Sequence, residues 1–297
     1  MKIFLLTICF LSVQTGMVAI AQDKKQTPVY LDDAQPIEVR VQDALNRMTV
    51  EEKTRLSYAQ GKFSSPGCPR LGIPELWMSD GPHGVRAEIN WNDWGYVGWT
   101  NDSCTAFPAL TCLAASWNPL LAEKYGYAIG EEARYREKDV LLGPGVNIYR
   151  TPLNGRNFEY MGEDPYLASE LCVPYIQGVQ KNGVAACVKH YALNNQELWR
   201  GHIDVQLSDR ALYEIYLPAF KAAVERGKAW SIMGAYNKVR GTHATHHKLL
   251  NNDIYQISYY SRSDTKGSTE EIVNDHRNNA GNSTRVNKHS SFTCRKN

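Results

Sequence analysis

The sequence predicts an α/β fold in which a parallel sheet curls into a (β/α)8 barrel, the TIM-barrel type. Short apolar runs alternate along the chain with longer segments that carry apolar residues at helical spacing, a pattern typical of βαβ units. Polar residues follow several of these runs directly: Asp80, Arg150, Lys189-His190 and Tyr236-Asn237. Strand ends meet on one face of a barrel, where active sites are built. We therefore favour the barrel over an open doubly wound sheet.

A glycine-rich dinucleotide turn would favour the open sheet, and the sequence offers only a poor match. Gly143-Pro144-Gly145 lacks the third glycine and lies within a strand and loop stretch instead of opening a helix. We predict no nucleotide cofactor, and no other cofactor is indicated.

The first predicted elements are a helix, a loop and a strand. Residues 41–60 have apolar positions at helical spacing, and Thr49-x-x-Glu52 has the form of a capping box inside that stretch. A loop rich in Gly, Pro and Ser follows. The apolar run Leu76-Trp77-Met78 then ends abruptly in Ser79-Asp80-Gly81, so Asp80 is predicted at the carboxyl end of a strand.

The later elements alternate regularly. Helices are predicted at 119–138, 165–181 and 208–226, with Pro119 in a first turn and Ser208 as a cap. Strands are predicted at 140–142, 146–149, 184–188 and 230–235.

Composition excludes two classes of partner. The 297 residues are 43% hydrophobic and 22% charged, which is ordinary for a globular protein with a sizeable core. The net charge is +2, and both signs are interspersed. We therefore expect no nucleic-acid partner and no electrostatic attraction to a membrane surface.

The first 21 residues have the pattern of a secretory signal peptide. Lys2 supplies the positive start, Ile3 to Val13 is mostly apolar, and Ala19-Ile20-Ala21 is a small-x-small cleavage site. A membrane span needs about 20 consecutive apolar residues, and polar residues interrupt this stretch from Ser12 onward. We expect a mature chain from about Gln22, secreted or periplasmic and without a membrane anchor.

The cysteines and histidines are candidates for disulfide bridges and metal ligands. An oxidising compartment permits disulfides, and Cys68 and Cys104 in loop-like stretches are one candidate pair. Apolar surroundings predict that three others are buried small hydrophobes, namely Cys112, Cys172 and Cys187. His243, His246 and His247 have no carboxylate or cysteine nearby at ligand spacing, so no metal site is predicted.

Four segments call for a common explanation. They are Ser79-Asp80-Gly81-Pro82-His83-Gly84-Val85-Arg86, Pro152-Leu153-Asn154-Gly155-Arg156-Asn157-Phe158-Glu159, Val188-Lys189-His190-Tyr191 with Asn194-Asn195-Gln196-Glu197, and Met233-Gly234-Ala235-Tyr236-Asn237-Lys238-Val239. Each alone has an ordinary structural explanation as a turn or an ion pair. Together, charged residues at successive strand ends describe a cleft that binds hydroxyl groups. Tryptophans would supply flat walls for sugar rings, and we expect only some of these five on the ligand face because tryptophans are also common in cores: Trp77, Trp91, Trp94, Trp99 and Trp199.

In this order the segments resemble the N-terminal barrel domain of family 3 glycoside hydrolases, the β-glucosidase and β-xylosidase family. The predicted helix that begins Ser208-Asp209-Arg210-Ala211-Leu212 is also similar to that family, and the resemblance covers roughly residues 40–251. The family implies that Asp80, Arg156, Lys189 and His190 line the subsite for the terminal sugar.

The resemblance also implies individual roles. Asp80 would accept hydrogen bonds from ring hydroxyls, Lys189 and His190 would donate to hydroxyls, and Arg156 would bind one hydroxyl and orient its neighbours. Tyr236 occupies a family position near the nucleophile. Glu159 is expected to support Arg156 and not to touch the sugar.

The pattern breaks before the family's catalytic nucleophile, an aspartate in a Ser-Asp-Trp type segment. Ser263-Asp264 is the candidate, but it lacks a preceding apolar strand and is followed by Thr265. Residues 252–297 contain no Leu, Met, Trp or Pro, so we expect a divergent polar tail that is disordered. A frameshift near Asn252 to Tyr255 or a genuine divergent tail would each explain the change. The barrel is thus expected to be incomplete at its C-terminal end.

The expected organisation is a signal peptide at 1–21, a partial barrel at 22–251 and the tail at 252–297. The expected function, by resemblance, is retaining hydrolysis of terminal β-linked sugars from oligosaccharides or glycosides, impaired in this chain because the nucleophile and acid/base are missing. Two alternatives stay open: a sugar-binding protein without catalysis, and a nonfunctional fragment.

Overall fold

The computed structural model describes residues 27–86 and 103–256, and the chain divides into two compact units, 1–48 and 49–297. The first unit contains a 3-10 turn, Val29–Leu31, and helix α1, Ile37–Arg47. Several expectations concern residues outside the described ranges: the signal peptide, Trp91, Trp94, Trp99, Asp264 and Cys294. No described helix combines the length and hydropathy that a membrane crossing requires.

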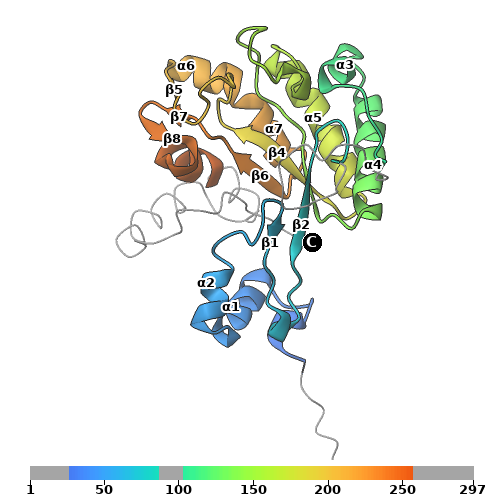
Figure 1. Ribbon diagram of the computed structural model, residues 1–297, viewed down its shortest axis with the longest axis vertical. Helices are drawn as coiled ribbons and strands as arrows, with labels where there is room; N and C mark the ends of the chain where they lie inside the picture. Colours follow the sequence, from blue (N-terminus) through green and yellow to red (C-terminus); the bar gives the residue numbers. More distant parts are fainter. Residues whose placement is uncertain (1–26, 87–102, 257–297) are drawn as a thin grey trace, which may run out of the picture. The chain divides into compact units, whose positions relative to one another are not determined.

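The second unit alternates strands with helices, coloured along the chain in Figure 1. Its first elements are α2 (Val50–Arg55), β1 (Ser64–Ser65), β2 (Leu76–Asp80), α3 (Leu110–Ala115), α4 (Pro119–Tyr135) and β3 (Val140–Leu142). They are followed by α5 (Pro165–Gln180), β4 (Ala185–Tyr191), β5 (Asp204–Val205), α6 (Asp209–Ala211), α7 (Pro218–Glu225), β6 (Ser231–Gly234), β7 (Lys238–Val239) and β8 (Thr242–His243). The short helical turns are Pro69–Leu71, Asn157–Glu159, Leu212–Tyr216, Ala244–His246 and Leu249–Gln256.

The main sheet has the strand order β1-β2-β3-β4-β6. Strand β1 pairs antiparallel with β2, and β2, β3, β4 and β6 are parallel neighbours in chain order. A doubly wound sheet reverses its strand order at a switch point, whereas a (β/α)8 barrel adds each strand beside the last. The described part is therefore an α/β fold of the barrel type, as predicted.

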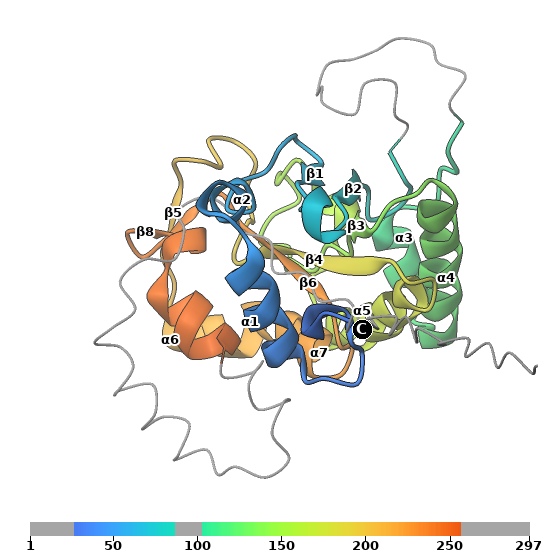
Figure 2. The same cartoon turned by 90° about the horizontal axis from the view of Figure 1, so that it is seen from below.

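Side chains alternate between two packing faces along these strands. Leu141, Ala186 and Val188 belong to the large core that packs against α4, α5 and α7, and Figure 2 shows α5 and α7 beneath β4 and β6. Met78 and Cys187 belong to a second, smaller cluster on the opposite face of the sheet. Because side chains two residues apart share a face, Asp80 and Lys189 extend this second face at the strand ends.

The predicted helix at 41–60 is wrong as a single element. Met48 (φ −74°, ψ 140°) and Thr49 (φ −70°, ψ 167°) both have extended backbone angles, which end the helical run at Arg47. The Thr49 side chain accepts from the backbone N–H of Glu52, and the Glu52 carboxylate accepts from that of Thr49. The capping box recognised in the sequence therefore starts a new helix, α2, which ends at Arg55.

Three further local predictions need correction. Residues 146–149 form no strand although 146–148 are buried, and Gly145 beside them makes an isolated bridge to Lys189. The predicted helix at 208–226 is interrupted by the π-helical turn Leu212–Tyr216 before Pro218 starts α7. Strand β4 runs on to Tyr191, so Lys189 and His190 lie inside its last residues instead of after them.

The cysteine predictions are met in part. Cys68 is a buried free thiol, so the considered bridge to Cys104 is not formed. Cys172 and Cys187 are buried as expected, but Cys112 is exposed because it lies on the outer face of α3.

Candidate functional site

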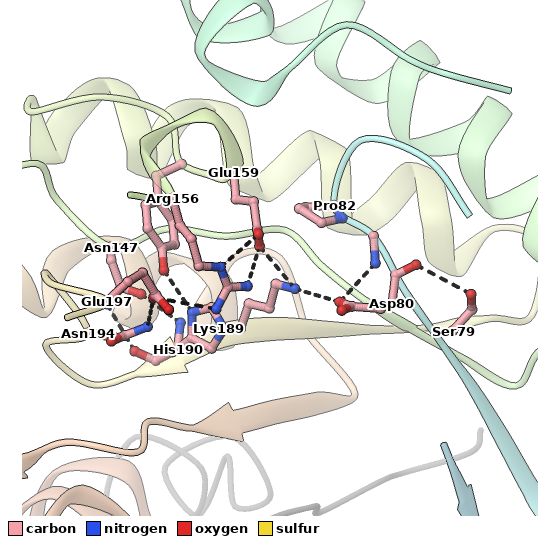
Figure 3. Close-up of polar contacts among 12 residues, drawn as sticks. Ser79, Asp80, Pro82, Asn147, Arg156, Glu159, Lys189, His190, Asn194 and Glu197 are labelled. Atoms are coloured by element: carbon pink, nitrogen blue, oxygen red, sulfur yellow. Dashed lines mark hydrogen bonds and ion pairs between the residues drawn. The ribbon is translucent and has the colours of Figure 1, made fainter. Parts of the chain in front are cut away.

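Lys189 is the centre of the most densely charged buried region that the structure describes. Its side chain is 1% exposed, and its Nζ lies 2.9 Å from Asp80 Oδ1 and 3.2 Å from Glu159 Oε2. Figure 3 shows the ammonium between the two carboxylates. A lysine buried this deeply needs paired charge to offset its lost hydration. We call Asp80, Arg156, Glu159, Lys189 and Glu197 the Lys189 cluster.

Asp80 is held at the carboxyl end of β2 by the turn that follows it. The backbone N–H of Gly81 donates to Asp80 Oδ1 at 3.0 Å, and that of Arg86 donates to the Asp80 carbonyl at 3.0 Å. Gly81 has φ +126°, and a Cβ there would come within 1.6 Å of the Gly84 carbonyl oxygen. Only glycine fits this turn, which aims the carboxylate at Lys189.

Arg156 and Glu159 form a bidentate pair across a 3-10 turn. Arg156 Nε donates to Glu159 Oε1 at 2.8 Å, and Nη2 donates to Oε2 at 2.7 Å. Parallel N–H···O bonds of this kind fix geometry as well as charge. Since Oε2 also faces Lys189, Glu159 sets the position of the guanidinium relative to the ammonium.

Glu197 extends the cluster toward Tyr236. It accepts hydrogen bonds from Asn194 Nδ2 at 3.0 Å and Arg200 Nη1 at 2.7 Å, and its Oε1 lies 3.5 Å from Arg156 Nη1. The Arg200 guanidinium carbon lies 4.7 Å from the centroid of the Tyr236 ring, within cation–π range. Arg200 therefore connects Tyr236 to Glu197, at the edge of the cluster.

His190 is fixed separately from the charged groups. Asn147 Nδ2 donates to the His190 carbonyl at 2.9 Å, and the His190 N–H donates to Asn147 Oδ1 at 2.8 Å. The Tyr160 hydroxyl lies 2.9 Å from His190 Nδ1. The β4–β6 register shifts between Val188 and Tyr191, so strand alternation alone does not say where the imidazole points.

The pKa shifts show which groups are charged. Burial alone would raise the pKa of Asp80, but Lys189 and, less strongly, Arg156 outweigh it and hold that pKa below the ordinary 3.8. Burial opposes ionisation of Glu159 too, yet Arg156 and Lys189 hold its pKa below the ordinary 4.5. Burial, reinforced by the positive charges of Lys189, Arg156 and Arg200, lowers the pKa of His190 well below 6.5. At neutral pH Asp80 and Glu159 are therefore ionised and the His190 imidazole is neutral.

This arrangement suits recognition of hydroxyl groups. Ionised carboxylates accept hydrogen bonds, Lys and Arg donate them, and each is oriented by a neighbour. Neither Asp80 nor Glu159 is suited to donate a proton, because both have lowered pKa values. These two carboxylates therefore suit binding of a polyhydroxylated molecule better than general-acid catalysis.

The structure brings four sequence-predicted residues together, namely Asp80, Arg156, Lys189 and His190. Tyr236 contacts Arg200 and is connected to the other residues through it. Glu159 contacts Lys189 as well as Arg156. Their roles in binding stay predictions. The sequence reasoning missed the parts of Asn147, Tyr160 and Arg200, because each depends on a contact between segments distant in the chain. Glu197 stood in a noted segment, but no role was assigned to it.

Two aromatic predictions have different outcomes. Trp77 lies near the amino end of β2, where the Lys138 ammonium is 5.7 Å from its ring centroid, so it does not line the cluster. Trp199 is exposed and packs edge-on against His202. Arg150, predicted at a strand end, stacks on Tyr216 instead of joining the cluster.

A cavity of about 960 Å³ lies elsewhere, between α5, α7 and the segment 249–256. Its lining includes Tyr166, Phe220 and Ile254, together with Glu170 and Arg226, which pair with each other. No member of the Lys189 cluster borders it. The dense polar network is the better candidate site because its charges are buried and converge.

Comparisons with known proteins point the same way. Residues 53–257 match the model of the glycosyl hydrolase family 3 N-terminal domain. A β-glucosidase of Bacteroides ovatus is 98% identical over 254 residues, which are 86% of this chain and 34% of that relative. A thermostable β-glucosidase B of Acetivibrio thermocellus is 42% identical over 218 residues, covering 73% of this chain and 28% of that protein.

Solved structures agree in fold. β-Glucosidase 3B of Thermotoga neapolitana, solved in complex with glucose, superimposes with a TM-score of 0.67 at 39% identity, over 74% of this chain and 32% of that one. The chain thus spans about a third or less of the length of these relatives.

Proposed function

The chain belongs to glycosyl hydrolase family 3, and from that premise we propose that its Lys189 cluster is the subsite that recognises the terminal sugar of β-linked oligosaccharides or glycosides. The observation that carries this proposal is the placement of Asp80, Lys189 and Arg156 within one hydrogen-bonded network. Such a network offers acceptors and donors to neighbouring sugar hydroxyls without needing a charged ligand.

The reaction that this subsite serves is retaining hydrolysis, which divides the work between recognition and two catalytic carboxyl groups. Those carboxyl groups stand about 5 to 5.5 Å apart, one as nucleophile and one as acid/base. Asp80, Glu159 and Glu197 are each held in ion pairs, so the described cluster takes the recognition part. Asp264 is the candidate nucleophile within the chain.

A second candidate function, sugar binding without turnover, follows from the same ion pairing. An engaged carboxylate is a poor nucleophile and no acid, so the described residues alone would retain a sugar without cleaving it. We expect the 297-residue chain to bind a β-glucoside and to release product poorly or not at all.

The experiment compares turnover with binding on one molecule, 4-nitrophenyl β-D-glucoside. Release of nitrophenol is followed by its absorbance, and equilibrium binding of the glucoside is measured in parallel. Both measurements are made on the unmodified chain and on Asp264→Asn. Saturable binding with little release supports recognition without efficient catalysis. Release that Asp264→Asn abolishes would assign the nucleophile to Asp264. Failure to bind or to cleave this glucoside, or the matching xyloside, would overturn the proposal.

We also propose that the protein is exported to the periplasm or the cell exterior, where it would act in carbohydrate breakdown. The support is the signal-like pattern of residues 1–21. Intact-mass analysis of the expressed protein tests it: a mature N-terminus near Gln22 is expected, and a retained Met1 in a secretion-competent host would contradict it.

A further inference from the structure

We infer that Tyr160 is a positioning residue that holds His190 in the tautomer protonated on Nε2, so that the imidazole presents an N–H donor to a sugar hydroxyl. The inference deepens the proposed function and rests on it for the identity of the ligand. Its structural half, the tautomer, stands on the contacts around the imidazole alone.

The first step is the hydrogen bond between the two side chains. Tyr160 is fully buried and His190 is 2% exposed, and the hydroxyl oxygen lies 2.9 Å from Nδ1. Among the residues that the structure describes, no hydrogen bond reaches Nε2. Nδ1 is therefore the nitrogen that the protein engages, and Nε2 is the one left for a ligand.

The second step is the direction of that bond. A neutral imidazole has one N–H donor and one acceptor nitrogen, whereas a tyrosine hydroxyl can play either part. Burial raises the pKa of Tyr160, so the hydroxyl keeps its proton. Among the residues that the structure describes, His190 Nδ1 is the partner that lies within hydrogen-bond distance of that hydroxyl. A buried O–H left without an acceptor is costly, so the hydroxyl donates its proton to Nδ1.

The third step is the state of the imidazole. Burial of the ring, reinforced by the nearby cations, keeps His190 neutral; those cations are Lys189, Arg156 and Arg200. A neutral ring can exchange between two tautomers, and the partner of one nitrogen decides which nitrogen has the proton. Asn147 holds the backbone of His190 by bonds to both its N–H and its carbonyl.

The test is ¹⁵N NMR of the ¹⁵N-histidine-labelled chain near neutral pH, with His190→Gln used to assign the signal. The unmodified chain should show His190 neutral and protonated on Nε2. Tyr160→Phe removes only the hydroxyl and should move His190 toward a mixture of tautomers or the Nδ1–H form. Tyr125→Phe is the matched control, since it removes an equally engaged tyrosine hydroxyl, bonded to the Pro108 carbonyl at 2.6 Å.

Titration of the same samples with D-glucose tests the ligand half. Tyr160→Phe should weaken binding about fivefold, the loss expected of one hydrogen-bond donor, while Tyr125→Phe leaves it unchanged. An Nδ1–H tautomer in the unmodified chain, or an unchanged tautomer in Tyr160→Phe, overturns the positioning role. A shifted tautomer with unchanged glucose affinity overturns the donor role. Absence of glucose binding in the unmodified chain instead overturns the proposed function, and the tautomer signal still decides the structural half.

Discussion

The Lys189 cluster and the exposed ion pair between Arg210 and Glu214 use the same chemistry in opposite surroundings. Lys189 is 1% exposed and lies between two carboxylates, whereas the Arg210 and Glu214 side chains are 83% and 58% exposed although they are also 2.9 Å apart. Water screens the second pair but has little access to the Lys189 ammonium. Although the distances are similar, losing one partner should cost far more unfolding free energy in the buried cluster than in the exposed pair.

Buried charge networks are better indicators of function than surface ion pairs. A surface pair on a helix forms because its residues are four apart and costs the protein little to keep or lose. A buried network survives only when every charge is compensated, and its presence at converging strand ends calls for an explanation beyond stability. Ligand recognition supplies one.

Replacing Lys189 should lower the free energy of unfolding more than any other substitution considered in the two regions. Lys189→Met fills similar space but leaves Asp80 and Glu159 facing each other without the ammonium. We expect a loss of about 3–5 kcal/mol in the free energy of unfolding, because an uncompensated buried charge remains. Urea denaturation measures it. A loss below about 1 kcal/mol would mean that water reaches the cluster freely.

Glu159→Gln should have the next largest effect. The amide keeps the shape but removes the charge that Arg156 and Lys189 share, so one N–H contact becomes unsatisfied. We expect a loss of about 1–3 kcal/mol in unfolding free energy. Tighter glucose binding by Glu159→Gln would contradict its supporting role, because a correctly held Arg156 should bind better than a released one.

The buried site should also make the free energy of unfolding depend on pH. His190 has a folded-state pKa well below 6.5, so between that pKa and 6.5 the unfolded chain binds more protons. The unfolding free energy should therefore fall as the pH drops below about 6.5. Asp80 and Glu159, with pKa values below 3.8 and 4.5, add stability above those values that is lost at lower pH.

Urea denaturation at a series of pH values checks this sign. His190→Gln should flatten the decline in the region just below pH 6.5, and Asp80→Asn should flatten the decline at lower pH. A wild-type curve that rises as the pH falls through this range would contradict the assigned charge states.

Much of the fold and part of the site could be predicted from the sequence. Helical spacing of apolar residues, with Pro119 in a first turn, predicted α4 and α5 closely, because those signals are local. Thr49 was recognised as a cap, but its power to end one helix and start another depends on the backbone turn it adopts. The predicted domain boundary at residue 251 stays a prediction.

The rest of the site could not be predicted because it depends on contacts between distant segments. Tyr160 meets His190 across 30 positions, and Lys189 meets Asp80 across 109. Residue type indicated that Lys189 and Asp80 belonged to a polar site. Nothing local indicated that Tyr160 would face an imidazole.

Removing the exposed pair should have the smallest effect. Arg210→Ala breaks the bond to Glu214 at the surface and should change the unfolding free energy by no more than about 0.5 kcal/mol. The same denaturation assay measures it. A loss comparable to that of Lys189→Met would erase the distinction between the two regions.

The most direct test of the central claim is calorimetric titration of D-glucose into the unmodified chain, Asp80→Asn and Arg210→Ala. The account predicts saturable binding that Asp80→Asn weakens at least about tenfold, since one charged hydrogen bond is worth about that factor, and that Arg210→Ala leaves unchanged. Equal glucose affinity in the unmodified chain and a folded Asp80→Asn variant would contradict the claim that the Lys189 cluster is a sugar-recognition site.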